Sequence, residues 1–220
     1  MKTWIFLAAS FSAFILSTVN SNATVTIQLQ AETLRDQNGV AMTSSGLFLL
    51  VSSTTNAGFG SLVAGSSTAV GQSITGDSDY VVLRGNLVSS FANYGVDGVL
   101  DFTATGIDLS SVPGWSTGDP MALLWFPTLT TASTTIPEGT PYGMYTNATA
   151  IDGSDAWVTP NDPSTARYGF FTQDGTNVGP GANPNSAGNA SYVVGAVPEP
   201  SRTVLGFVGL SMLMLRRRRC

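Results

Sequence analysis

Gly46-Leu47-Phe48-Leu49-Leu50-Val51 is the stretch of sequence that decides the fold. It is a continuous apolar run of strand length, which is typical of a strand buried on both faces. Upstream, Val25, Ile27 and Leu29 alternate with polar residues, which predicts a half-buried strand. Thr, Ser, Gly, Asn and Val dominate the middle of the chain, and signals for helices are scarce. The sequence therefore predicts an all-β protein.

The remaining strands are expected in short apolar or alternating runs that are separated by loops rich in Gly, Asn, Asp and Pro. Asp36-Gln37-Asn38-Gly39 has the composition of a turn, whereas a short helix near 32–35 is the alternative to continuous strand structure there. Many short strands with a turn about every ten residues suggest a single antiparallel β-sandwich or jelly-roll-like domain. The further strands are expected at 80–88, 96–109, 121–126, 143–146, 156–158, 167–172 and 191–194.

The N-terminus has the pattern of a secretory signal peptide. Lys2 supplies a positive charge, residues 4–16 are apolar apart from two serines, and Ser21-Asn22-Ala23 places small residues before a cleavage site. Cleavage between Ala23 and Thr24 is expected, through export by the Sec translocon. A buried N-terminal core helix is the alternative, but there is no charge after Lys2 in this segment.

The C-terminus combines an apolar segment, 203–215, with four consecutive arginines, Arg216, Arg217, Arg218 and Arg219. A helix over this segment would be about 20 Å long at ~1.5 Å per residue, shorter than a hydrocarbon core of ~30 Å. Flanking arginines extend the span by snorkelling, and the positive-inside rule places the arginine cluster in the cytoplasm. We therefore expect one short transmembrane helix that contacts membrane lipid, with the domain before it outside.

Val197-Pro198-Glu199-Pro200-Ser201, followed by this helix and the arginine cluster, resembles the PEP-CTERM protein-sorting domain. Pro198, Glu199 and Pro200 match its motif, and Arg216–Arg219 match its basic end. The resemblance implies a Gram-negative bacterium that makes extracellular polysaccharide, and processing by a membrane-embedded transpeptidase, exosortase. A plain linker before the membrane is the alternative. Cys220 departs from the family pattern. It is either an incidental terminal residue or a thiol open to lipidation or disulfide formation.

These features divide the chain into a signal peptide (1–23), a β-rich ectodomain (24–175), a stalk rich in Gly, Asn and Pro (176–195) and the sorting signal (196–219). Between Thr24 and Val197 there are three arginines and thirteen acidic residues, which give a net charge of −10. Nucleic acid is an implausible partner for such a surface, because its binding needs cationic side chains to neutralise phosphates. The chain has no histidine, and its one cysteine is Cys220. Ser-His-Asp triads, Cys-His pairs and zinc sites of the Cys/His type are therefore excluded.

Two pairs of aspartates are candidate calcium ligands. Asp77 and Asp79 follow Gly76, and Asp152 and Asp155 enclose Gly153-Ser154. Calcium prefers several oxygen ligands, which such acidic loops can supply. The alternative is ordinary turn chemistry, in which an Asp accepts hydrogen bonds from its own backbone. No other cofactor is expected.

Five aromatic residues could stack on sugar rings as in lectin-like modules, or could fill the core of a sandwich. Trp125 lies in an apolar run and is expected in the core, whereas Trp115 stands between Gly114 and Ser116 and is the better candidate for the surface. The others are Trp157, Tyr142 and Tyr145.

We expect a non-enzymatic protein that is exported, anchored in the inner membrane as a precursor and then located at the cell surface or in the extracellular matrix, associated with exopolysaccharide. One competing interpretation is a secreted glycosidase that uses a pair of acids such as Asp97 and Asp101, four residues apart on one expected strand. The other is a calcium-dependent carbohydrate-binding module.

Overall fold

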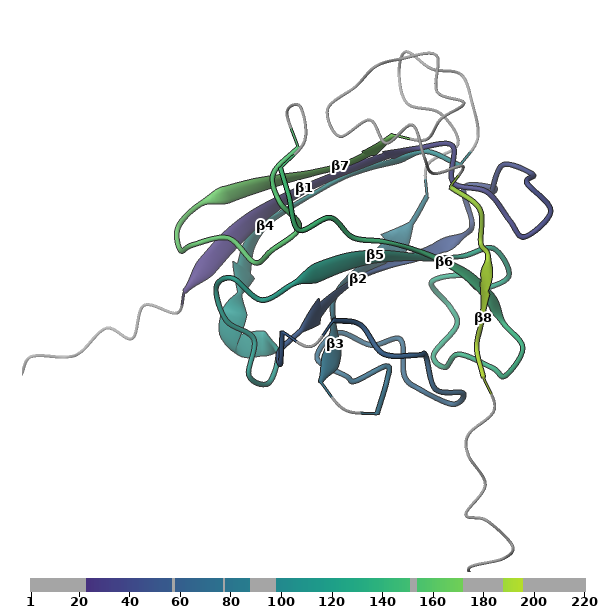
Figure 1. Cartoon of the computed structure of the whole chain (residues 1–220), viewed down its shortest axis with the longest axis horizontal. Coiled ribbons are helices and arrows are strands. Elements are labelled where there is room, and N and C mark those ends of the chain that lie inside the picture. Colours follow the sequence, from purple (N-terminus) through teal and green to yellow (C-terminus); the bar gives the residue numbers. More distant parts are fainter. Residues whose placement is uncertain are drawn as a thin grey trace, which may run out of the picture.

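The computed structural model describes residues 23–56, 58–76, 78–87, 98–150, 154–171 and 188–195. Within these ranges the chain is almost entirely β, with two facing sheets and one short 3₁₀ helix (Figure 1). The expectation of an all-β fold is confirmed. The elements are β1 (Thr24–Glu32), β2 (Leu47–Ser53), β3 (Asp79–Asn86), β4 (Leu100–Asp108), η1 (Leu109–Ser111), β5 (Met121–Phe126), β6 (Pro141–Tyr145), β7 (Thr165–Phe171) and β8 (Tyr192–Val193).

The smaller sheet has the strand order β4-β1-β7. β1 pairs with β4 in the antiparallel direction but runs parallel to β7, with Thr26 opposite Thr165. The expectation of a wholly antiparallel sandwich is therefore wrong at this pair. No hairpin links β1 to β7, because five strands lie between them along the chain, so no tight turn imposes the antiparallel direction.

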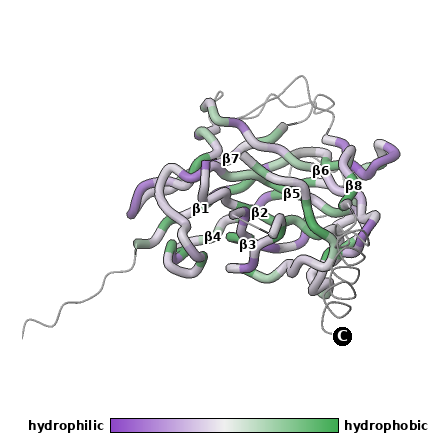
Figure 2. Tube along the Cα trace, turned by 60° about the horizontal axis from the view of Figure 1, so that its bottom comes forward, coloured by the Kyte–Doolittle hydropathy of each residue, from purple (hydrophilic) through white to green (hydrophobic). Residues whose placement is uncertain are grey.

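The larger sheet has the strand order β3-β2-β5-β6-β8, and every pair in it is antiparallel. β2 and β5 lie at its centre, with Leu47 opposite Phe126 and Ser52 opposite Met121. In Figure 1 this sheet forms the lower layer, and β1, β4 and β7 form the upper layer. Figure 2 shows that hydrophilic residues lie mainly in the loops at the periphery.

The main core lies between the two sheets. Alternate residues of β1, including Val25, Ile27 and Leu29, point into it, which confirms the half-buried strand expected from the sequence. Tyr145 of the larger sheet stacks on Phe170 of the smaller sheet, with 3.9 Å between ring centroids. This contact joins the two layers through aromatic packing.

A second apolar cluster covers the opposite face of the larger sheet. Every residue of β2 is buried, because loops lie over the face that would otherwise meet water. This confirms that the deciding stretch forms a strand buried on both faces. The covering side chains come from outside the strands of that sheet, and they are Leu62, Ile74, Leu129, Ile136 and Val194.

Some expected elements differ from the observed ones. No helix forms at 32–35, where β1 ends at Glu32 and Arg35 makes isolated bridges to Ala41 and Asn189. The expected strand at 156–158 is reduced to a single bridge between Pro120 and Val158. The turn at 36–39 is confirmed, since the Asp36 carboxylate accepts the N–H groups of residues 38 and 40. These hydrogen bonds, chiefly the one from residue 40, lower the pKa of Asp36.

The last residues described, 188–195, belong to the folded domain, although they fall within the segment predicted as a stalk. They include β8, which pairs with β6, and the side chains of Ala190 and Val194 are buried. The predicted signal peptide before Ala23 and the predicted transmembrane helix at 203–215 lie outside the described residues. Among the residues that are described, no helix has the length and apolar character needed to span a bilayer.

Candidate functional site

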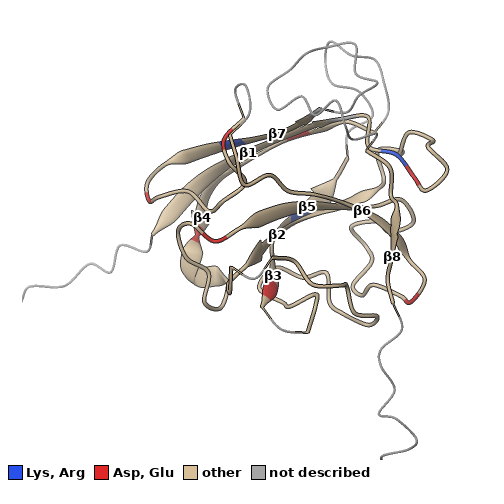
Figure 3. Ribbon diagram, viewed as in Figure 1, with Lys and Arg blue, Asp and Glu red and all other residues tan. Residues whose placement is uncertain are grey.

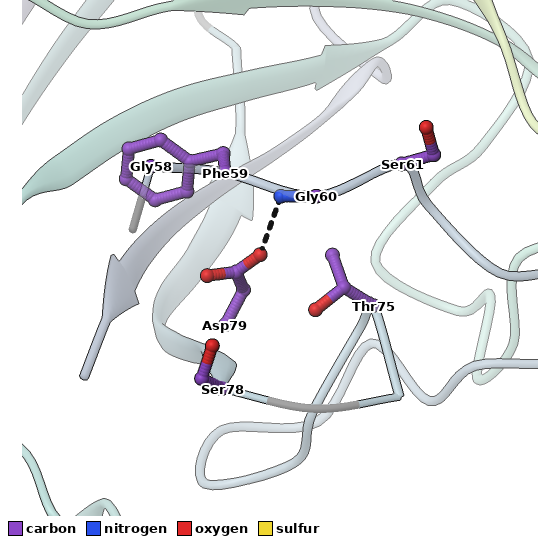
Figure 4. A pocket seen from close by; sticks show the side chains of 7 residues that line it. All are labelled: Gly58, Phe59, Gly60, Ser61, Thr75, Ser78 and Asp79. Atoms are coloured by element: carbon purple, nitrogen blue, oxygen red, sulfur yellow. Dashed lines mark hydrogen bonds between the residues drawn. The ribbon is translucent and has the colours of Figure 1, made fainter. Parts of the chain in front are cut away.

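A small pocket lies beside the start of β3, beneath the segment that follows β2 (Figure 4). Its volume is about 290 Å³, at the lower end of the range for ligand sites in proteins. The lining residues come from two chain segments, and they are Gly58, Phe59, Gly60, Ser61, Thr75, Ser78 and Asp79. We call this the Asp79 pocket.

Asp79, the first residue of β3, is the one charged side chain among the lining residues. It is only 2 % exposed. Its Oδ2 accepts a hydrogen bond of 2.8 Å from the backbone N–H of Gly60, whereas its Oδ1 is buried and has no hydrogen-bond partner. An ionised carboxylate offers about four acceptor positions, so most of this capacity is unused.

Thr75 faces Asp79 across the pocket, and Figure 4 shows its hydroxyl group on the side of the carboxylate. The Thr75 Oγ1 atom is also buried without a hydrogen-bond partner. Buried polar atoms in folded proteins are nearly always hydrogen-bonded, and unpaired ones often mark a site for a water, an ion or a ligand. Two residues that line the pocket therefore each carry a buried oxygen without a hydrogen-bond partner.

A narrower and largely apolar space adjoins the pocket. Asp79 and Thr75 also border this space, which is lined by Val51, Leu62 and Leu124, together with neighbouring apolar residues. These apolar neighbours lower the local dielectric constant on one side of Asp79.

No cationic side chain contacts Asp79 among the described residues. Arg84 lies on the same strand, but its guanidinium donates to the backbone carbonyl groups of Thr131 and Ser133. Arg167 lies on β7 of the other sheet and donates to Gln28. Figure 3 shows that the positions of charged residues are dispersed along the ribbon of the domain. The pocket is therefore acidic and should favour ligands with a positive charge or with hydrogen-bond donors.

The structure does not bring the calcium candidates together. Asp79 lies in the larger sheet, whereas Asp155 is exposed beside β7 of the smaller sheet, where its Oδ2 accepts the N–H of Arg167 at 2.7 Å. Their predicted partners, Asp77 and Asp152, lie outside the described residues. Within the described ranges, no three side chains of the His, Cys, Asp or Glu type gather as metal ligands do.

The glycosidase pair is described only in part. Asp101 is exposed on β4, and its carboxylate accepts a hydrogen bond from Gln30 of the neighbouring strand at 3.4 Å. Asp97 lies outside the described residues.

The aromatic candidates prove to be mostly core residues. Trp115 was expected at the surface, but it is only 5 % exposed, and its Nε1 donates to Thr159 Oγ1 at 2.6 Å. The expectation of an exposed Trp115 is therefore wrong. The neighbouring residues Gly114 and Ser116 are typical of a loop, but the indole ring points into the core. Trp125, as expected, is in the core, and Trp157 and Tyr145 are buried there too.

A stacked aromatic pair reaches the surface at β8. Tyr192 of β8 is 46 % exposed and stacks on Tyr142 of β6, with centroids 5.3 Å apart and planes inclined by 25°. Tyr142 is itself buried, and this burial raises the pKa of its phenol group. Tyr192 was not among the expected sugar-binding residues, although the sequence predicted a strand at 191–194 that contains it.

The residues of the predicted targeting signals are described only at the N-terminal end. Ala23 packs partly against the core, and its carbonyl accepts the N–H of Leu109. The backbone N–H of Thr24 donates to Asp162 Oδ1 at 2.9 Å. Pro198, Glu199 and Pro200, and the arginines at 216–219, lie outside the described residues.

No family model, no curated protein and no solved structure matches this chain.

The Asp79 pocket was only partly visible in the sequence. The sequence indicates the acidic pair that contains Asp79. The segment Gly58-Phe59-Gly60 carries no acidic residue, so nothing in the sequence predicts that this segment lies beside Asp79. The signal available was an aromatic residue between two glycines, a pattern that permits close approach of the backbone to another group. The long loop between β2 and β3 makes the contact, and its path depends on tertiary packing.

Proposed function

We propose that this protein is a non-enzymatic component of the cell envelope or extracellular matrix of a Gram-negative bacterium, where it associates with exopolysaccharide. It is exported through the Sec translocon, held in the inner membrane by its C-terminal segment, and sorted by an exosortase-like enzyme. Pro198, Glu199 and Pro200 form the recognition motif, and Arg216–Arg219 form the cytoplasmic anchor.

The observation that carries this proposal is the position of the folded domain between the two predicted targeting segments. The first strand begins at Thr24, directly after the predicted cleavage site, and the last strand ends at Val193, shortly before the Pro-Glu-Pro motif. A domain with these limits can be released from its signal peptide and its tail without loss of a strand.

Two further features favour a binding role over catalysis. The whole chain lacks histidine, so the commonest general base and metal ligand is not available. The acidic candidates that the structure describes, Asp79, Asp101 and Asp155, lie on different strands or loops, and each carboxylate accepts a hydrogen bond from another residue.

The experiment is fractionation of a polysaccharide-producing Gram-negative host that contains an exosortase. The wild-type protein is compared with a variant that carries Pro198→Ala, Glu199→Ala and Pro200→Ala. We expect the wild type in the surface polysaccharide fraction and the variant in the inner membrane. Asp101→Asn, an exposed substitution on β4, serves as the control. An unchanged distribution of the tail variant would contradict the proposal.

A further inference from the structure

We infer that the Asp79 pocket binds an amino sugar, a sugar residue with a free, protonated amine, within a polysaccharide. This inference rests on the proposed function, which supplies the polysaccharide, and it adds the chemical class of the sugar and the site that binds it. It depends on three features of the pocket: a buried carboxylate with an unpaired oxygen, the size of the space, and its mixed polar and apolar walls.

The charge of the ligand follows from Asp79. The protein supplies one hydrogen bond to this carboxylate, from Gly60, and leaves Oδ1 buried and without a partner. Burying a charged group without a partner is strongly unfavourable. An ammonium group both donates hydrogen bonds and neutralises the charge, whereas a neutral hydroxyl group donates without neutralising it. Protonated amines are therefore favoured over neutral sugars.

A divalent metal ion is a poorer match for the same residues. Calcium is held by six to eight oxygen ligands and usually by several carboxylates. The residues that line this pocket include one carboxylate, that of Asp79, and the hydroxyl groups of Ser61, Thr75 and Ser78. A single positive charge on the ligand matches the single negative charge of the site.

The size of the pocket favours a sugar over a bare ion. Its volume of about 290 Å³ corresponds to roughly ten water molecules at about 30 Å³ each. That space accommodates a sugar ring with its substituents. Ser61 and Ser78 add polar residues to the lining, and the partly buried Phe59 supplies an apolar wall of the kind on which sugar rings stack.

Gly60 offers a way to fill the pocket without removing any polar group. A methyl group added at Gly60 would lie 3.4 Å from two carbon atoms of Thr75 and 3.6 Å from Asp79 Oδ2, which is ordinary contact. Gly60→Ala therefore keeps the hydrogen bond to Asp79 while it narrows the space for a ligand. Asp79→Asn removes the charge and retains an amide oxygen that can accept from Gly60.

The test is a binding titration of the full-length protein, purified in detergent, with glucosamine oligomers. Two oligomers of equal length are compared, one fully deacetylated and one fully N-acetylated, at a pH at which the amines are protonated. We expect the deacetylated oligomer to bind at least tenfold more tightly, and its binding to weaken at least tenfold in Asp79→Asn and in Gly60→Ala. Asp101→Asn, which removes an exposed charge from the other sheet, should leave binding unchanged. Thermal melting confirms that each variant is folded.

Equal binding of the two oligomers, or wild-type affinity in Asp79→Asn, would overturn the inference. The result also separates this inference from the proposed function. If the protein retains neutral polysaccharides and neither Asp79→Asn nor Gly60→Ala weakens their binding, the amino-sugar site is refuted while the envelope role stands. If fractionation shows that the tail does not direct sorting, but the glucosamine oligomer still binds through Asp79, the proposed function fails and the pocket remains.

Discussion

The backbone N–H of Gly60 donates a hydrogen bond of 2.8 Å to Oδ2 of Asp79, which joins the loop after β2 to the first residue of β3. One carboxylate thus serves two purposes, since Oδ2 holds the loop while Oδ1 is left unpaired beside the pocket. The loop also covers part of the second apolar cluster through Leu62 and Ile74. Local structure, packing and the candidate site therefore depend on the same side chain.

Two substitutions of Asp79 should distinguish its hydrogen bond to the loop from the effect of its unpaired oxygen. Asp79→Ala removes the acceptor for Gly60 and leaves a cavity in the pocket, so the free energy of unfolding should fall by about 1–3 kcal/mol. Asp79→Asn retains an acceptor and removes an unpaired buried charge, so its loss should be smaller. Urea denaturation of both variants measures the difference. Equal losses would show that the hydrogen bond to Gly60 does not hold the loop.

Gly143 should be intolerant of any side chain, because it lies directly against Trp125. A Cβ atom built at Gly143 would be 1.9 Å from an atom of the Trp125 ring, far inside van der Waals contact. Gly143→Ala must displace the indole, and overpacking of this kind typically costs about 1–3 kcal/mol. Gly195→Ala is the matched control, since nothing lies within 4 Å of its Cβ position. Thermal melting should show a large loss for the first variant and little change for the second.

Tyr168 should make the protein sensitive to alkaline conditions. Burial raises the pKa of its phenol above the ordinary value of 10.0, and the negative charge of Asp155 raises it further. Above pH 10.0 the unfolded chain therefore loses a proton that the folded protein retains. The stabilisation is complete below that pH and falls by up to about 1.4 kcal/mol per pH unit above it.

Tyr168→Phe tests this linkage. The variant loses the hydrogen bond of 2.6 Å from the Tyr168 hydroxyl to the carbonyl of Val158, so it should be less stable by about 1 kcal/mol at neutral pH. Its stability should then decline less steeply than that of the wild type as the pH rises above 10.0. Urea titrations at neutral and alkaline pH measure both effects. Parallel pH profiles for the two proteins would contradict the assignment to Tyr168.

Cleavage of the signal peptide should create a new ion pair. The backbone nitrogen of Thr24 lies 2.9 Å from Asp162 Oδ1, and cleavage after Ala23 would make it a charged α-amino group. Because the pair is exposed, we expect Asp162→Asn to destabilise the processed protein by less than about 1 kcal/mol, and only at low salt. The uncleaved precursor should be affected less. Equal effects in the two forms, measured by urea denaturation, would mean that the new α-amino group of Thr24 does not pair with Asp162.

The strands were predictable where burial leaves a pattern in the sequence. Alternation identified β1 through Val25 and Ile27, and an unbroken apolar run identified β2. What covers the outer face of β2 was not predictable, because the covering residues Leu62 and Ile136 lie in loops and reach the sheet through tertiary packing. The parallel pairing of β1 with β7 is a contact between distant parts of the chain, for which the local sequence carries no signal.

The candidate site shows the same limit. Asp79 was singled out for its neighbour Asp77, as half of a calcium site, whereas the structure relates it to Gly60 and Thr75. Trp115 was misplaced because its flanking residues are typical of loops, although its ring lies inside and its Nε1 donates to Thr159. The residue types therefore indicated which side chains could bind a ligand, whereas the residues that contact these side chains could be identified only from the fold.

We propose that this chain is a precursor that is cut at both ends on its way to the cell surface. Intact-mass measurement of the protein recovered from the surface fraction of its host tests this most directly. We predict a product that begins at Thr24 and lacks the apolar segment and arginine cluster of residues 203–219. Recovery of the whole 220-residue chain, with both ends intact and no shorter product at the surface, would contradict the account.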